Sequence, residues 1–171
     1  MGTEVEFTLR PWRMSDAVSI ARYANNKNIA QNLRDGFPHP YTHADALAFI
    51  EDSLRKDGKT QLIRAIVVEG EAVGSIGAFL QEDVYRKSAE IGYWLGEPFW
   101  GKGIMTEAIP LFCKEVFGKF DLVRLFAEPF AYNMGSRRAL EKAGFTLEGT
   151  LRKSVIKNGM LFDSCIYALL R

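Results

Sequence analysis

The stretch that decides the fold reads Phe99-Trp100-Gly101-Lys102-Gly103-Ile104-Met105-Thr106-Glu107. Before it, residues 89–95 alternate as a half-buried strand does, and after it a helical pattern begins. A strand, a glycine turn and a helix N-terminus form an anion site, because the first helical amides have no intrahelical partner and the helix dipole adds positive charge. Gly101 and Gly103 allow close backbone approach, and Lys102 adds a cation. The sequence therefore predicts a phosphate or pyrophosphate site.

Two nucleotide-binding motifs match this turn only in part. Residues 96–102 match G-x-x-x-x-G-K, but Gly103 stands where a P-loop needs Ser or Thr to bind magnesium. The dinucleotide pattern G-x-G-x-x-G fails because Thr106 occupies the last glycine position. A P-loop nucleotide binder stays as an alternative, and so does a plain strand–helix connection that needs glycines only for its shape.

Composition and charge narrow the class of protein. A chain of 171 residues with a formal charge of +1 has no global field that would attract nucleic acid or an anionic membrane. No apolar run reaches the length of a membrane span, and no secretory signal is visible. Cys113 and Cys165 lie in apolar segments, which predicts buried free thiols in a reducing compartment. We expect a single cytoplasmic domain over residues 1–171, with no metal and no contact to nucleic acid or membrane.

Hydrophobic periodicity and turn signals predict the element order β-α-α-β-β-β-α-β-α-β-β. The predicted strands are residues 5–9, 62–68, 72–80, 89–95, 123–128, 145–155 and 161–170. The predicted N-caps of three helices are Ser15, Thr42 and Asn133, and a fourth helix follows Gly103 and ends at Gly118. Because parallel strands need a crossover, that fourth helix joins residues 89–95 to residues 123–128. The fold class is α/β (α+β), a mixed sheet of about seven strands with helices on its faces.

A second motif supports a particular family. Residues 133–148 read N-M-G-S-R-R-A-L-E-K-A-G-F-T-L-E, and residues 100–108 read W-G-K-G-I-M-T-E-A. Both resemble blocks of the RimJ/RimL-like branch of the GCN5-related N-acetyltransferase (GNAT) superfamily. The wider Q/R-x-x-G-x-G/A signature matches at Gly103 and departs from it at Trp100 and Met105. Two motifs in the right order make the resemblance span nearly the whole chain, and it implies a twisted, mostly antiparallel sheet.

The resemblance also implies a cofactor and the residues that hold it. Acetyl-CoA would lie where the strands at residues 93–95 and 123–127 separate. Backbone at Tyr93, Trp94 and Leu95 would pair with the pantetheine arm, and one of these amides would polarise the acetyl carbonyl. Asn133 would also bind the arm. The residues implied to hold the pyrophosphate are Gly101, Lys102, Gly103, Ile104, Met105 and Thr106.

Catalytic roles follow from the resemblance in part. Ser136 would protonate the departing thiolate or orient a water toward it, since Leu140 stands where many superfamily members carry a tyrosine acid. Val155 stands near the position where some branch members carry a glutamate base, so the base stays open. Glu90 is the first candidate because it lies on the strand beside the cleft, and His39, in a proline-bounded loop, is the second.

We therefore expect an acetyl-CoA-dependent N-acetyltransferase in which an amine attacks the thioester directly. Its acceptor stays open between a ribosomal-protein or other peptide N-terminus and a small amine, and aromatic residues such as Phe37 and Tyr41 suggest where it binds. A non-catalytic CoA-binding regulatory module is the alternative, because the tyrosine acid is missing and the base is unplaced. The chain is expected to be a monomer or a homodimer.

Overall fold

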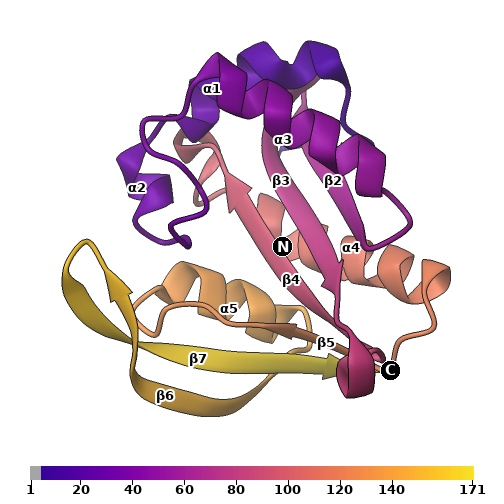
Figure 1. Cartoon of the computed structure of the whole chain (residues 1–171), viewed down its shortest axis with the longest axis vertical. Coiled ribbons are helices and arrows are strands. Elements are labelled where there is room, and N and C mark those ends of the chain that lie inside the picture. The colour runs from indigo at the N-terminus through magenta and orange to yellow at the C-terminus, as the bar shows by residue number, and fades with distance from the viewer. Residues whose placement is uncertain (1–4) are drawn as a thin grey trace.

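The computed structural model describes residues 5–171. Its centre is a seven-stranded sheet in the order β1-β2-β3-β4-β5-β7-β6 (Figure 1). The strands are β1 (Thr8–Arg10), β2 (Gln61–Val68), β3 (Glu71–Leu80), β4 (Ser88–Leu95), β5 (Arg124–Ala127), β6 (Thr146–Lys157) and β7 (Met160–Leu170). Only β4 and β5 pair in parallel, and every other pair is antiparallel. The predicted mixed, mostly antiparallel sheet is therefore confirmed.

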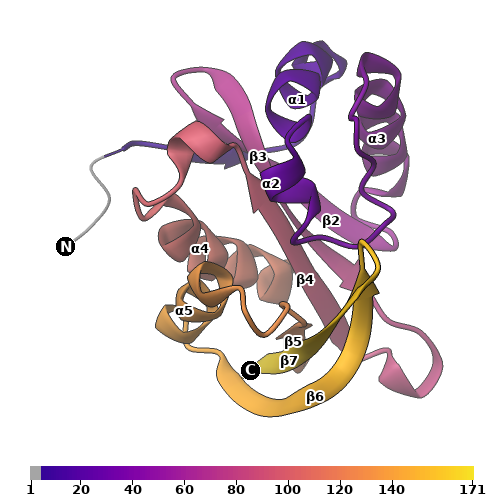
Figure 2. The ribbon, with the colours of Figure 1, turned by 90° about the vertical axis from the view of Figure 1, so that its left-hand side faces the viewer.

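The helices are α1 (Ala17–Ala24), α2 (Lys27–Ala30), α3 (His43–Lys56), α4 (Ile104–Lys119) and α5 (Met134–Lys142). Figure 2 shows α1 and α3 on one side of the sheet and α4 and α5 on the other. The predicted order holds with one addition. This is the one-turn helix α2, which follows α1 and begins where the Asn26 side chain accepts a hydrogen bond from the Asn28 amide at 2.8 Å. Helix α4 also ends one residue later than predicted, at Lys119.

Two apolar layers hold this arrangement together. One lies between the sheet and α4 and α5, and includes the fully buried Ile76, Phe112 and Leu125. The other lies between the sheet and α1 and α3, and includes Trp12 and Ile50. Alternation along each strand sends successive side chains to opposite layers. The two cysteines are buried and free, as the sequence predicted.

Glycine on β3 lets β4 approach closely. A Cβ atom at Gly74 would lie 2.6 Å from the carbonyl oxygen of Trp94, so no larger residue fits without a shift of backbone. Opposite Gly74, the register of β2 and β3 shifts between Ile66 and Val67. The close approach and the register shift occur at the same place, and they set the position of the end of β4.

Strands β4 and β5 separate after a short pairing. Their register runs from Ser88↔Arg124 to Glu90↔Phe126. Strand β4 then continues to Leu95, whereas β5 ends at Ala127. The sheet is therefore open between these two strands, as the resemblance implied. Within residues 5–171, none of the helices combines the length and apolar character that crossing a membrane requires.

Candidate active site

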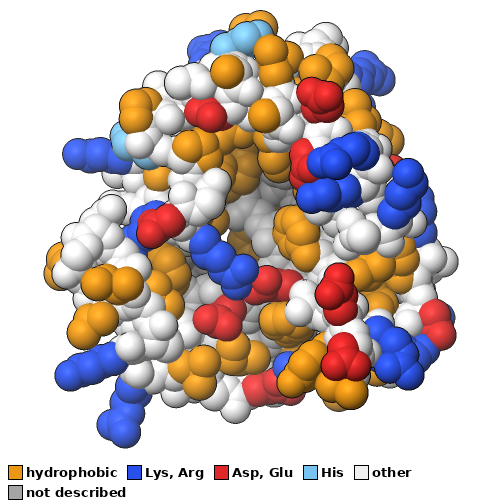
Figure 3. Space-filling view, viewed as in Figure 1, with side chains coloured by type: hydrophobic (Ala, Val, Ile, Leu, Met, Phe, Trp, Pro, Cys, Tyr) orange, Lys and Arg blue, Asp and Glu red, His pale blue; other side chains and the backbone are white. Residues whose placement is uncertain are grey.

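A cleft of about 1300 Å³ opens where β4 and β5 separate. Figure 3 shows this face hollowed near its centre, with acidic and basic side chains around the opening. The lining comes from β4, the glycine turn, the end of β5, helix α5, the loop at residues 32–38 and the end of β6. Segments far apart in the sequence therefore share one cavity, which is large enough for an extended ligand.

The edge of β4 that faces this cleft carries backbone hydrogen-bonding groups. The Gly96 amide donates to the Val73 carbonyl at 2.7 Å, which fixes the alternation of hydrogen bonds between β3 and β4. The amide and carbonyl groups of Ile91, Tyr93 and Leu95 consequently point away from β3, toward β5. The Leu95 carbonyl accepts a hydrogen bond from the Trp100 indole at 2.6 Å. An extended ligand can therefore pair with this edge as a strand would.

The glycine turn leads into the N-terminus of α4. Gly101 and Gly103 have φ values of 73° and 78°, a left-handed conformation that L-residues adopt at a cost. Gly103 is the N-cap, and among the described residues no side chain caps the helix. The amides of Ile104, Met105 and Thr106 are the first of the helix, and these residues line the cleft. The turn has the predicted anion-site geometry. Lys102 is exposed and does not line the cleft.

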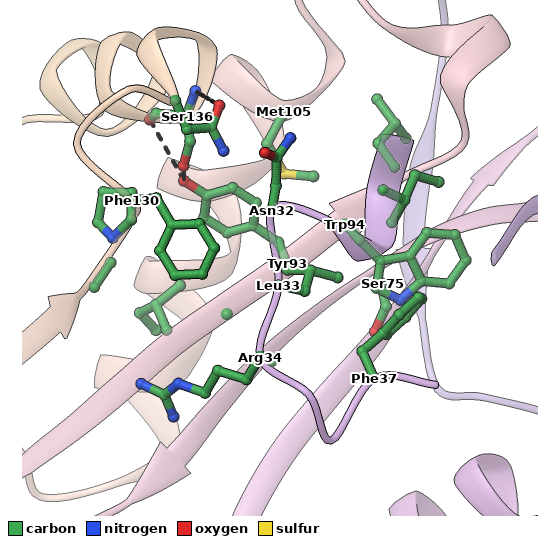
Figure 4. Close-up of a pocket in the computed structure, with 18 of the residues that line it drawn as sticks. Asn32, Leu33, Arg34, Phe37, Ser75, Tyr93, Trp94, Met105, Phe130 and Ser136 are labelled. Carbon is green, nitrogen blue, oxygen red and sulfur yellow. Dashed lines mark hydrogen bonds between the residues drawn. The ribbon is translucent and has the colours of Figure 1, made fainter. Parts of the chain in front are cut away.

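A pair of hydroxyl groups stands on the α5 side of the cleft. Tyr93 Oη and Ser136 Oγ lie 2.6 Å apart, and Figure 4 shows the tyrosine ring extending from β4 to the first turn of α5. Asn133 is the N-cap of α5, and its side chain accepts a hydrogen bond from the Ser136 amide at 3.4 Å. Burial raises the pKa of the Tyr93 phenol well above its usual range. Leu140 is fully buried, and the hydroxyl groups of Tyr93 and Ser136 are the ones that line the cleft here.

An ion pair occupies the opposite side. Arg34 contacts Glu90 through two hydrogen bonds, Nη1 to Oε1 at 3.1 Å and Nη2 to Oε2 at 2.5 Å. The Glu90 side chain is 17% exposed and that of Arg34 is 71% exposed, so the pair stands at the rim of the cleft. Its hydrogen bond to Glu90 raises the pKa of the Arg34 guanidinium, and the charge of Glu128 adds to the effect.

Glu128 lines the cleft, and the sequence reasoning missed it. Leu125 and Ala127 face the layer under α4 and α5, so alternation places Glu128 on the opposite face with Glu90. The feature of the sequence that could have indicated Glu128 is its position at the end of the strand predicted over residues 123–128, which borders the cleft. A carboxylate at a strand end carries no motif, which is why only the packing brings it to attention.

Aromatic side chains form the far wall of the cleft. Phe37 packs against Tyr41 at 5.1 Å between ring centroids and against Trp94 at 5.9 Å, and all three line the cleft. Burial raises the pKa of Tyr41 to about 12. His39 lies in the same loop, but it is exposed and does not line the cleft. The geometry therefore brings Glu90, Asn133 and Ser136 to one cavity and does not bring His39 there.

The loop over the cleft is fastened to the C-terminal half of the chain. Tyr132 Oη donates to Asn32 Oδ1 at 2.5 Å, and Lys157 Nζ donates to Asp35 Oδ1 at 2.9 Å. Figures 1 and 2 both show the tip of the β6–β7 hairpin beside this loop. Residues 5–171 contain no group of three His, Cys, Asp or Glu side chains arranged to hold a metal ion.

Comparison with known proteins assigns this site to a class. The family model for an acetyltransferase (GNAT) domain matches residues 6–146. The chain is 36% identical over 120 residues to the probable N-acetyltransferase YjcK of Bacillus subtilis. This match covers 70% of this chain and 66% of YjcK, so the chain spans just under two thirds of the length of that relative. It is 30% identical over 166 residues to the uncharacterized N-acetyltransferase p20 of Bacillus licheniformis, covering 96% of this chain and 92% of p20.

Solved structures give the same class. The Microcin C7 self-immunity acetyltransferase MccE, in complex with acetyl-CoA and AMP, superposes with a TM-score of 0.84 at 29% identity, covering 97% of this chain and 93% of that one. Mycobacterium smegmatis RimJ, in complex with a CoA disulfide, superposes with a TM-score of 0.84 at 25% identity, covering 96% and 81%. The chain therefore belongs to the GNAT family of acetyltransferases, with RimJ/RimL-like relatives, and is an N-acetyltransferase that uses acetyl-CoA. This membership overturns the P-loop alternative.

Proposed function

We propose that this protein transfers the acetyl group of acetyl-CoA directly to a primary amine, with both substrates bound in the one cleft. The observation that carries this proposal is that the open edge of β4 and the N-terminus of α4 border the same cavity as Ser136. A covalent enzyme intermediate is not part of it, because burial raises the pKa of Cys113 to about 12 and a neutral thiol is a poor nucleophile.

The chain offers a bonding partner to each part of the acyl donor. The helix amides of Ile104, Met105 and Thr106 would bind the pyrophosphate, next to Gly101 and Gly103, with Lys102 adding positive charge. The backbone of Tyr93 and Leu95, together with Asn133, would bind the pantetheine arm. The expected contribution of the Trp94 backbone is wrong, because its amide and carbonyl point toward β3, opposite Ser75. One amide of this strand edge would polarise the acetyl carbonyl, where negative charge develops during attack.

The acid and the base would then act from opposite sides. Ser136 would donate its hydroxyl proton to the departing sulfur, because it lines the α5 side of the cleft. Glu90 stays our first candidate for the base, since it lines the cleft on β4, although Arg34 holds both of its oxygens. Glu128 is the alternative carboxylate on this side.

The acceptor that fits best is the α-amine of a peptide or protein N-terminus. With a pKa of about 7.7–8.0, roughly a tenth of such an amine is neutral at pH 7, so it needs little help from a base. A lysine-like amine with a pKa of about 10.4 needs a base that is free to act. A relative, the ribosomal-protein-serine acetyltransferase of Escherichia coli, is 32% identical over 103 residues, 60% of this chain and 57% of its own length. A small amine is the second candidate.

Other expectations belong to the same proposal. The chain would act as a single N-acetyltransferase domain over residues 1–171, as a monomer or homodimer in the cytoplasm. It would not bind nucleic acid or membrane directly.

The test has two stages with purified protein. Calorimetric titration with acetyl-CoA should give micromolar or tighter binding, and desulfo-CoA analogues should bind as well, because the pyrophosphate and pantetheine contacts remain. Incubation with acetyl-CoA and separate pools of peptides and small amines should then release free thiol in the peptide pool. Binding without thiol release in any pool would support the regulatory module, and absence of binding would remove the proposal.

A further inference from the structure

The Tyr93–Ser136 contact joins two elements that the sequence separates by 43 residues. Tyr93 lies on β4 beside the cleft, and Ser136 lies in the first turn of α5. Figure 4 shows the phenol reaching the serine hydroxyl. Both residues line the cleft, so the hydrogen bond between them lies at its wall.

The chemistry of the two hydroxyls fixes the direction of this hydrogen bond. A phenol is a far stronger acid than an alcohol, with a reference pKa of about 10, so Tyr93 is the better donor and Ser136 the better acceptor. Tyr93 Oη also lies 3.5 Å from the Ser136 carbonyl oxygen, which can only accept. Both contacts favour Tyr93 as the donor, and the proton of Ser136 is then left to point into the cleft.

We propose that Tyr93 is a positioning residue for acetyl transfer, which holds Ser136 in the one orientation that directs its hydroxyl proton at the sulfur of the leaving thiolate. This inference rests on the proposed function. It would also explain how a helix with Leu140 at the usual tyrosine position could keep an acidic function: a tyrosine from β4 reaches Ser136, about one turn before Leu140.

The step balances without a change of charge on Tyr93. The bond from the acceptor nitrogen to the acetyl carbon forms, the carbon–sulfur bond breaks, and its electron pair stays on sulfur. Ser136 gives its proton to that sulfur. The nitrogen gives its proton to the base, for which Glu90 is the first candidate, and water then carries a proton from the base back to the serine oxygen. Tyr93 keeps its proton throughout, consistent with the raised pKa that burial gives it. A chain of two hydrogen bonds ending at a charged sulfur strengthens each bond in it.

The test is Tyr93→Phe, which removes only the hydroxyl. We expect kcat to fall about fivefold to tenfold, the scale of one hydrogen bond, with the Kd for CoA within twofold of wild type. The matched control is Tyr23→Phe, because Tyr23 donates an equally short bond, 2.6 Å to Glu71, and does not line the cleft. That variant should keep the wild-type kcat.

A double-mutant cycle separates positioning from general support of the fold. In a Ser136→Ala background, Tyr93→Phe should change kcat by less than twofold, because the group it orients is gone. An equal loss in both backgrounds would overturn the inference, as would a wild-type kcat in the single variant. If the melting temperature of Tyr93→Phe lies far below that of Tyr23→Phe, Tyr93→Met replaces Tyr93→Phe. Its kcat is then compared with that of Tyr23→Phe at a temperature at which circular dichroism shows both variants folded. If the wild-type protein itself does not bind CoA or does not transfer acetyl groups, that result would instead count against the proposed function.

Discussion

Arg34 and Glu90 are joined by two hydrogen bonds at the rim of the cleft, at 3.1 Å and 2.5 Å. Arg34 belongs to the loop after α2, and Glu90 belongs to β4 at the last position where that strand pairs with β5. The Glu90 carboxylate thus binds the loop that carries Arg34 and, in our proposal, also accepts a proton from the acceptor amine. These two roles make opposite predictions for the arginine.

Glu90→Gln should lower kcat/KM for the amine acceptor at least tenfold, because an amide cannot accept the proton and general bases contribute about 10²–10⁴-fold. Arg34→Met should leave kcat/KM within about twofold, since it keeps the length of the side chain and frees the carboxylate. Steady-state kinetics at saturating acetyl-CoA measures both.

Equal losses in these two variants would show that the ion pair itself matters and that Glu90 is not the base. Glu128→Gln serves as the comparison, because Glu128 lines the same face of the cleft without such a two-point contact in the described residues. A larger loss there would transfer the role of the base to Glu128.

Ser136→Ala should reduce kcat about a hundredfold while the Kd for CoA stays within twofold. The serine hydroxyl acts only as charge develops on sulfur, so its removal affects the transition state more than the bound cofactor. Calorimetry and kinetics on one preparation provide both numbers. The control is Ser154→Ala, because Ser154 on β6 forms a hydroxyl pair with Ser164 on β7 and neither residue lines the cleft. Comparable losses of binding and turnover would make Ser136 a binding residue.

The sequence predicted the features that depend on neighbouring residues. The predicted N-caps at Thr42 and Asn133 are present, and Thr42 forms a capping box with Asp45. The predicted N-cap at Ser15 is wrong, because a helical turn already begins at Met14 with Arg13 as its N-cap. Asn158 and Gly159 both have positive φ, as a two-residue hairpin turn requires. Such features are local, because their geometry is set within a few residues.

Contacts across the sheet could not be predicted in the same way. The partners Tyr93 and Ser136 are separated by 43 residues, and Arg34 and Glu90 by 56. Each pair depends on the register of β4 and on how a helix or loop packs over it, which no local pattern encodes. The family resemblance predicted the cleft and its cofactor. Which side chains contact one another inside the cleft could be learned only from the packing in the structure.

Gly101→Ala should weaken CoA binding about tenfold and leave binding of pantetheine unchanged. Gly101 has a φ of 73°, and no atom lies within 4 Å of the position a Cβ would take, so the substitution adds backbone strain without a clash. Left-handed backbone costs an alanine about 1–2 kcal/mol, and the turn would relax away from the shape that presents the helix amides.

The control for this variant is Gly159→Ala, because Gly159 has a φ of 77° and equally open space but lies at the β6–β7 turn. The stability of Gly159→Ala should fall by a similar amount, while its affinity for CoA stays that of wild type. If pantetheine binding also falls in Gly101→Ala, the turn does not contact the pyrophosphate specifically.

Stability at alkaline pH should depend on Cys113. Burial raises the pKa of this thiol to about 12 from an ordinary 9.0, so the folded state favours the neutral form. The resulting stabilisation is complete below pH 9 and is lost as the pH rises through 12, with a slope of up to about 1.4 kcal/mol per pH unit from this group. Urea unfolding from pH 8 to pH 11 should therefore show a shallower decline for Cys113→Ala than for wild type. Val116→Ala also empties part of the buried face of α4 but removes no ionisable group, so its decline should match wild type. Parallel declines for all three proteins would mean that Cys113 is hydrated in the folded state.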